Sequence, residues 1–190
     1  MELLLIRHGL PLRVDEGDTT GPADPALADL GLRQANDLVT WLAPERIDAI
    51  WCSPMRRARE TAAPLAMALS LPITIEDHLA EFDRDASSYI PIEELKAAND
   101  PRWYELPERP EHFREEVVAA MERIIGAHGG QRVAVVCHGG VINAYAGHVL
   151  HIDEPLFFLP GYTSVSRVMA ASTGERSIGS LNETPHRRAL

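Results

Sequence analysis

Two histidines, each followed directly by glycine, are the residues of this chain best placed to do chemistry. His8 follows Arg7 and the apolar run 2–6, and His138 follows the apolar run 133–136. Apolar runs of this length suit strands of a parallel sheet that is covered on both faces. Because ligands bind at the carboxyl ends of such strands, we expect both imidazoles at one edge of the sheet, with a guanidinium beside them.

A further group of basic residues follows another apolar segment. Cys52 and Ser53 end that segment, and Arg56 and Arg57 come soon after it. Guanidinium groups match phosphate oxygens through paired hydrogen bonds and stay charged at any working pH. An imidazole can act as nucleophile, base or charged donor near neutral pH. Together these residue types predict phosphoryl transfer, with one histidine as the covalent carrier.

Composition defines the broad class. The chain has 190 residues, of which 45% are hydrophobic and 24% charged, and we expect one soluble globular domain over residues 1–190. The net charge of −10 argues against nucleic acid or an anionic membrane as a partner. Two cysteines are too few for a disulfide scaffold. Without an apolar membrane span or a signal peptide pattern, we expect a cytoplasmic protein, and we allow for a homodimer.

Strands and helices are expected to alternate. Continuous apolar runs and a closing pair predict strands at 2–6, 47–51, 132–137, 163–170 and 177–181. Apolar residues at helical spacing predict helices within 35–42, 58–69 and 113–128. Ser53 and Pro54 have the residue types of an N-cap and a first helical residue, so the second helix should begin there. The alternation predicts an α/β sandwich.

Two stretches interrupt this alternation. Residues 10–29 are rich in Gly, Pro, Asp and Thr and predict a loop that leaves the first strand. Residues 78–110 combine prolines, charged residues and aromatic side chains, and predict an inserted lid rather than core. We expect Tyr89, Trp103 and Tyr104 in this lid either to line the leaving-group side of the site or only to anchor the lid.

At these residues the sequence resembles the histidine phosphatase superfamily, the phosphoglycerate mutase-like group. Several motifs occur in the family's order, which makes coincidence negligible. The matching segments are Arg-His-Gly at 7–9, Asp-x-x-Leu-x-x-x-Gly-x-x-Gln-Ala at 24–35, Ser-x-x-x-Arg-Ala-x-x-Thr-Ala at 53–62, Leu-x-Glu at 79–81 and His-Gly at 138–139. The third motif assigns the pocket role to Arg57 rather than to Arg56.

The resemblance implies a three-layer α/β/α sandwich with a mixed, mostly parallel central sheet and a lid. It also implies a histidine acid phosphatase-type phosphomonoesterase, a hydrolase without metal or other cofactor. Neutral His8 would attack phosphorus and form a phosphohistidine, while Arg7, Arg57 and a protonated His138 hold the phosphate oxygens. Glu81 would protonate the leaving oxygen and then activate water.

The same resemblance extends to the substrate contacts. Partial burial of Glu81 under the lid, beside the bound anion, would raise its pKa in the direction that a proton donor needs. The partner is expected to be a small phosphorylated substrate. Sugar phosphates, nucleotides, phosphoproteins and small phosphorylated metabolites would all present the same phosphate to the pocket. The residues expected to bind substrate are Arg7, Gly9, Arg13, Arg57, His138 and Gly139.

This chain differs from the family pattern in two places. The mutases continue the first motif with Glu, whereas this chain has Leu-Pro-Leu-Arg at 10–13. A mutase needs a second phosphate contact, and only Arg13 offers one in the loop, so we place mutase activity below phosphatase activity. After Glu81 a glycine-rich segment is replaced by Phe-Asp-Arg-Asp, which makes Asp83 the alternative proton donor. A non-catalytic regulatory protein on the same fold is the third alternative, and the intact histidines and arginines argue against it.

Four further residues have simpler interpretations. A cysteine phosphatase needs arginine six residues after its cysteine, but Ala58 stands there after Cys52. Cys137 is expected to fill space at a strand end. His148 and His151 are more typical of a solvated helix end than of a metal site.

Overall fold

The computed structural model describes residues 1–104 and 106–189. In this part of the chain six strands form one sheet, in the order β3-β2-β4-β1-β5-β6. β1 to β4 run parallel to one another. β5 is antiparallel to β1, and β6 is antiparallel to β5. The strands are β1 (Glu2–Arg7), β2 (Ala49–Cys52), β3 (Ile73–Ile75), β4 (Arg132–Cys137), β5 (Val165–Ala170) and β6 (Arg176–Glu183).

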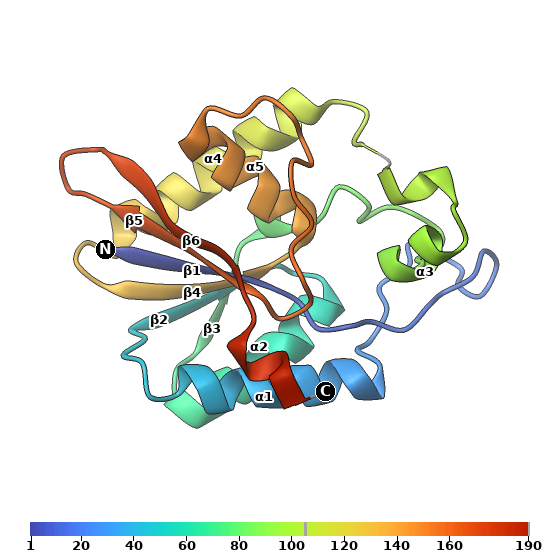
Figure 1. Ribbon diagram of the computed structural model, residues 1–190, viewed down its shortest axis with the longest axis horizontal. Coiled ribbons are helices and arrows are strands. Elements are labelled where there is room, and N and C mark those ends of the chain that lie inside the picture. The colour runs from blue at the N-terminus through green and yellow to red at the C-terminus, as the bar shows by residue number, and fades with distance from the viewer. Residues whose placement is uncertain (105, 190) are drawn as a thin grey trace.

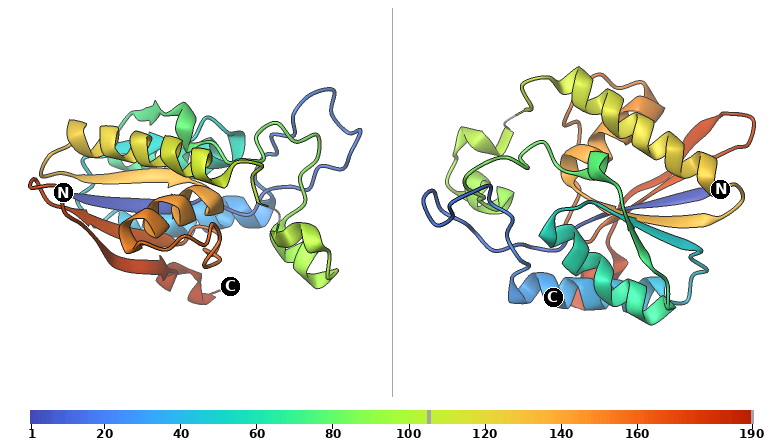
Figure 2. Two further views of the ribbon diagram at one scale, coloured as in Figure 1. Left: turned by 90° about the horizontal axis from the view of Figure 1, so that it is seen from above. Right: turned by 180° about the vertical axis from the view of Figure 1, so that it is seen from behind.

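Helices cover both faces of this sheet (Figures 1 and 2). α1 (Asp29–Leu42) and α2 (Arg56–Leu69) lie on one face, and α4 (Pro110–Ala127) and α5 (Gly139–Leu150) lie on the other. Successive side chains of a strand point to opposite faces. In β1, Leu4 and Ile6 accordingly join the core beneath α1 and α2, whereas Leu3 and Leu5 join the core beneath α4 and α5. The prediction of a three-layer α/β/α sandwich with a mixed, mostly parallel sheet is confirmed.

The register of β1 and β4 brings the two histidine motifs together. Arg7 pairs with Cys137, the last residue of β4. The ladder continues one residue further, where the backbone N–H of His8 donates to the carbonyl of Cys137 at 3.0 Å. Because the two strands are parallel neighbours that end at the same level, His8 and His138 leave the same edge of the sheet.

The start of α2 differs from the prediction. The helix begins at Arg56 with Met55 as its N-cap residue, so Ser53 and Pro54 lie before it. The hydroxyl of Ser53 does accept a hydrogen bond from the N–H of Met55, at 3.2 Å. However, this bond forms a turn ahead of the helix rather than a helix cap. β3 was also not predicted, because its three residues are too few to show an apolar run or an alternation of apolar and polar residues.

The segment between β3 and α4 extends from the carboxyl-terminal edge of the sheet (Figure 2). It contains α3 (Ile92–Ala97) and single 3₁₀ turns at Asp77–Leu79 and Pro101–Tyr104. The sequence analysis placed the start of a lid at about residue 78, but Leu79 is fully buried in the core beneath α4 and α5. We therefore use "lid segment" for residues 82–109. The loop 10–29 pairs with it, through a bridge between Val14 and Tyr89.

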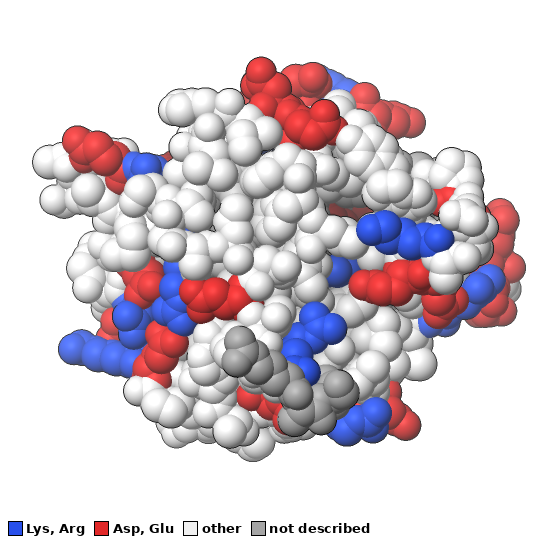
Figure 3. Space-filling view, in the orientation of Figure 1, with Lys and Arg blue, Asp and Glu red and all other residues white. Residues whose placement is uncertain are grey.

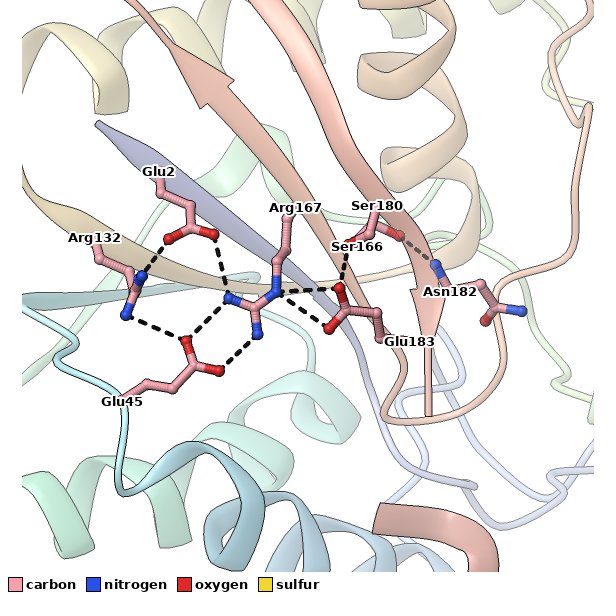
Figure 4. Close-up of polar contacts among 8 residues, drawn as sticks. All are labelled: Glu2, Glu45, Arg132, Ser166, Arg167, Ser180, Asn182 and Glu183. Atoms are coloured by element: carbon pink, nitrogen blue, oxygen red, sulfur yellow. Dashed lines mark hydrogen bonds and ion pairs between the residues drawn. The ribbon is translucent and has the colours of Figure 1, made fainter. Parts of the chain in front are cut away.

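A network of ion pairs links several strands around the start of β1, away from His8 (Figure 4). At its centre, the guanidinium of Arg167 on β5 contacts the carboxylates of Glu2, Glu45 and Glu183. Arg132 on β4 contacts Glu2 and Glu45 as well. The network ties β1, β4, β5 and β6 to the end of α1.

On the face drawn in Figure 3, basic side chains lie beside acidic ones, and a broad uncharged area separates the charged groups. Within residues 1–104 and 106–189, none of the helices has both the length and the apolar character that crossing a membrane requires.

Candidate active site

A cavity of about 440 Å³ opens at the carboxyl ends of the parallel strands. Its lining includes the predicted site residues Arg7, His8, Arg57, Glu81 and Gly139. His138 lies against this group, fully buried, with its ring centroid 5.0 Å from that of His8. Strand ends far apart in the sequence therefore supply one concave site, as the sequence analysis expected.

His8 is held in a defined orientation and tautomer. Its Nδ1 lies 2.8 Å from the carbonyl oxygen of Gly9. Because a carbonyl can only accept, Nδ1 must carry the hydrogen, and Nε2 keeps its lone pair. Burial, followed by the charges of Arg57 and Arg7, holds the pKa of His8 well below its usual range. The side chain is therefore a neutral imidazole with a free nucleophilic nitrogen.

His138 is oriented by a residue whose role the sequence analysis missed. Its Nε2 lies 2.7 Å from the hydroxyl of Ser53, which is fully buried at the end of β2. Burial, and then the positive charges nearby, hold the pKa of His138 well below its usual range. His138 is thus neutral in the free protein, in contrast to the protonated form that the resemblance implies for the complex with phosphate.

The two arginines are buried and individually oriented. Arg7 donates from Nη1 to the carbonyl of Pro160 at 2.6 Å, and its guanidinium lies 4.0 Å above the ring of Tyr162. Arg57 donates from Nη2 to Asp83 at 2.8 Å and lies 4.7 Å from the centroid of the Tyr89 ring. The side chains are fixed before substrate arrives, so binding an anion costs little rearrangement.

Several buried nitrogen atoms of these side chains have no hydrogen-bond acceptor within the described part of the chain. They are Nε of Arg7, Nε and Nη1 of Arg57, and Nδ1 of His138. Buried polar groups are nearly always satisfied in native proteins, so such a cluster calls for a ligand. Nitrogen donors on two guanidinium groups favour an anion with several oxygens, such as phosphate.

Glu81 lies beside this cluster and is prepared to hold a proton. Its Oε2 accepts from the N–H of Gly140 at 2.8 Å, and its Oε1 accepts from the N–H of Phe82 at 3.2 Å. Burial, with a further contribution from the charge of Asp83, raises the pKa of Glu81 to about 7. A carboxyl group with such a pKa can donate and accept a proton near neutral pH.

Arg13 and Gly9 do not line the cavity, which argues against the substrate contacts expected of them. The guanidinium of Arg13 is half exposed and pairs with Asp15 at 2.6 Å and with Glu94 at 3.3 Å. Gly9 is needed for packing, since a Cβ there would lie 2.7 Å from the carbonyl oxygen of Gly31. Sequence spacing could not separate a residue near the site from one inside it.

Aromatic residues of the lid segment, Tyr89, Trp103 and Tyr104, do line the cavity. Tyr104 also anchors the lid segment, because its hydroxyl donates to Glu154 in the loop after α5. These side chains thus line the cavity, and Tyr104 also fixes the segment to the loop after α5. Tyr162, which supports Arg7, was missed because it lies outside every motif and reaches the site only through the loop before β5.

The remaining candidates are not part of the site. Burial raises the pKa of Cys52 to about 12 and also raises that of Cys137, so both side chains are thiols rather than nucleophilic thiolates. His148 is exposed in the last turn of α5, and His151 caps that helix in the left-handed conformation. Among residues 1–104 and 106–189, no group of three or more His, Cys, Asp or Glu side chains is arranged to hold a metal ion.

The fold and the site together define an α/β protein with a histidine- and arginine-lined pocket at the carboxyl ends of its parallel strands. Residues 3–184 match the model of the histidine phosphatase superfamily, branch 1, and the chain belongs to that family. A probable phosphatase of Schizosaccharomyces pombe is 31% identical over 98% of this chain and 88% of its own length. Phosphoserine phosphatase 1 of Hydrogenobacter thermophilus is 30% identical over 87% of this chain and 84% of its own length.

Solved structures agree on the fold. A phosphoserine phosphatase variant from Entamoeba histolytica, in complex with phosphoserine, superimposes with a TM-score of 0.75 at 20% identity. That comparison covers 98% of each chain. The family prediction made from the motifs is therefore confirmed, and phosphatase function is supported at the level of the family.

Proposed function

We propose that this chain is a histidine acid phosphatase-type phosphomonoesterase that works through a phosphohistidine on His8 and needs no metal. One observation carries the proposal: Arg7 and Arg57, which line the cavity with neutral His8, and His138, whose ring centroid lies 5.0 Å from that of His8, keep buried nitrogen atoms with no partner among the described residues. Donors fixed in advance around developing charge are the main source of catalysis in phosphoryl transfer. The named phosphoserine phosphatases among the relatives support a small phosphorylated substrate.

In the first half-reaction, Nε2 of His8 attacks phosphorus, and the bond from phosphorus to the leaving oxygen breaks. Arg7 and Arg57 bind the non-bridging oxygens through the nitrogen atoms that have no protein acceptor. Glu81 transfers its proton to the leaving oxygen, so that an alcohol rather than an alkoxide departs. A pKa of about 7 keeps a useful fraction of Glu81 protonated at neutral pH.

In the second half-reaction, Glu81 is a carboxylate and accepts a proton from water as the water attacks phosphorus. The bond between Nε2 and phosphorus breaks, and inorganic phosphate and neutral His8 are restored. His138 assists both steps. If the hydroxyl of Ser53 donates to Nε2 of His138, the neutral ring carries its hydrogen on Nδ1 and can donate it to a phosphate oxygen. The negative charge of a bound phosphate also favours protonation of this ring.

Two alternatives are less well supported. A phosphotransferase of the mutase kind needs a second phosphate-binding group, but Arg13 pairs with Asp15 and Glu94 outside the cavity. A non-catalytic regulatory protein would not need His8, Glu81 and the arginines together. A cytoplasmic location stays part of the proposal, supported by two buried cysteines that form no disulfide. A homodimer stays a prediction.

The proposal is tested by turnover of phenyl phosphate and by trapping of the phosphoenzyme. The wild-type chain should release phosphate in the presence of a strong chelator. It should also retain labelled phosphate that is stable in alkali and lost in acid, as phosphohistidine is. His8→Ala should lose both signals while keeping the fold.

His148→Ala is the matched control, because His148 lies exposed at the end of α5, outside the cavity. This variant should behave as the wild type. Activity that appears only after a divalent metal is added, or a label retained by His8→Ala, would overturn the proposed mechanism.

A further inference from the structure

Beyond the phosphate end, the cavity is lined by apolar side chains. The residues on this side include Ile92, Leu95, Trp103, Tyr104, Leu156 and Leu159. They come from the lid segment and from the loop between α5 and β5. This part of the cavity receives the leaving group, because the phosphate is held at the other end by Arg7 and Arg57.

Two polar side chains of the cavity lining, Asn143 and Arg102, are engaged by other groups of the protein. Asn143 donates to the carbonyls of Gly139 and Phe158, both at 2.9 Å, and accepts from the N–H of Phe158. Its amide is therefore satisfied by the backbone. Arg102 is the cationic side chain that lines this side among the described residues, and its Nε and Nη2 donate to Oδ1 and Oδ2 of Asp100.

The other charges that line the cavity within residues 1–104 and 106–189 belong to the phosphate end. There, the carboxylate of Asp83 would repel a leaving group that carries a carboxylate, whereas Glu81 is protonated when the ester binds. Phosphoserine and 3-phosphoglycerate both carry one. A leaving group of that kind would have to compete with Asp100 for Arg102, or lose hydration without compensation.

The mouth of the cavity leaves large apolar side chains partly exposed. Trp103 is 37% exposed, Tyr104 42% and Leu159 40%. Lys96 covers one face of Trp103, with its Nζ 4.8 Å from the ring centroid. Exposed apolar surface beside an anion site is typical of a binding pocket for a partly apolar ligand, which would remove that surface from water.

We propose that the preferred substrates are phosphomonoesters of uncharged, apolar alcohols of aromatic-ring size, rather than phosphoserine or phosphoglycerate. This inference rests on the proposed phosphatase function and specifies its substrate class. The phosphate end supplies the chemistry, which is the same for every monoester, and the apolar walls select the alcohol. A pocket that fits an apolar group discriminates by about tenfold or more for each well-packed group.

The test compares 2-phenylethyl phosphate with O-phosphoserine and 3-phosphoglycerate. All three release an alkyl hydroxyl, and phenylethanol is no better a leaving group than the other two, so intrinsic reactivity does not favour it. We expect kcat/KM for 2-phenylethyl phosphate to exceed the other values by about tenfold or more. Equal values, or a preference for the carboxylate substrates, would overturn the inference while leaving the phosphatase intact. Failure to hydrolyse any monoester would instead refute the proposed function.

Leu159→Lys locates the preference in the pocket. The new ammonium should lower kcat/KM for 2-phenylethyl phosphate and raise it for O-phosphoserine, so that their ratio falls by about tenfold or more. Inhibition by inorganic phosphate should change little, which shows that the phosphate end is intact. Leu32→Lys is the matched control, because Leu32 on α1 is 44% exposed and lies outside the cavity. An unchanged ratio in Leu159→Lys would contradict the inference.

Discussion

Glu81 and Gly140 are in direct contact across the candidate active site. The carboxylate of Glu81 accepts the backbone N–H of Gly140, which lies in the first turn of α5, at 2.8 Å. A Cβ on Gly140 would lie 3.0 Å from the carboxyl carbon of Glu81, and closer still to Oε1. Gly140 therefore leaves the space that lets the proposed proton donor rest against the first turn of α5.

Gly140→Ala should displace Glu81 without touching the nucleophile. We expect kcat/KM for an alkyl phosphate to fall roughly tenfold to 100-fold, because a small displacement of a proton donor has effects of this size. The kcat/KM for an aryl phosphate should fall much less, since its leaving group needs little protonation. Gly126→Ala in α4 is the control, because nothing lies within 4 Å of its added Cβ. Equal losses on both substrates would show that Gly140 serves another purpose.

Glu81→Gln tests the proton donor itself. An amide can accept the hydrogen bond from Gly140 but cannot donate a proton to the leaving oxygen. Because kcat/KM reports only the steps up to release of the alcohol, kcat/KM for 2-phenylethyl phosphate should fall by roughly 10²-fold or more, while kcat/KM for 4-nitrophenyl phosphate should fall less than tenfold. The comparison is made by steady-state kinetics at pH 6. If both substrates lose the same factor, proton donation belongs to another residue.

Asp83→Asn separates the two carboxylates near Arg57. The charge of Asp83 helps to raise the pKa of Glu81, so its removal should lower that pKa. In the wild type, the acid form of Glu81 is lost as pH rises through about 7, and alkyl phosphate turnover should decline over that range. In Asp83→Asn the decline should begin at lower pH, with turnover retained below it. Loss of alkyl phosphate turnover at every pH would instead identify Asp83 as the donor.

Arg167→Ala addresses stability rather than catalysis. The side chain of Arg167 is only 16% exposed, and its loss leaves three carboxylates without this partner. We expect the free energy of unfolding to fall by roughly 2–3 kcal/mol, measured by urea denaturation. Arg46→Ala is the control, since Arg46 is 89% exposed and its ion pair among the described residues is with Asp48, so little or no loss of stability is expected. A similar loss in both variants would show that the network adds nothing beyond a surface pair.

The strands and helices of the sandwich could be predicted well where an apolar run or a helical spacing of apolar residues extended over many residues. β1 and β4 are continuous apolar runs, and α4 shows helical spacing over many residues. The local sequence pattern was misleading at Ser53, which has the residue type of a helix N-cap. Its hydroxyl instead accepts the N–H of Met55 in a turn before the helix and contacts His138. It was also too weak at β3, which pairs with β2 over only three residues.

The sequence by itself determined the chemical groups of the site and their place at strand ends. Arg7 is the last residue of β1, and His8 and His138 directly follow β1 and β4. The register of these two parallel strands therefore brings the three residues together. Only the tertiary structure decided that Arg13 lies outside the cavity, that Asp83 pairs with Arg57 and that apolar residues surround the leaving group. These contacts join segments far apart in the chain, and their geometry depends on how the lid segment and loops pack rather than on any local pattern.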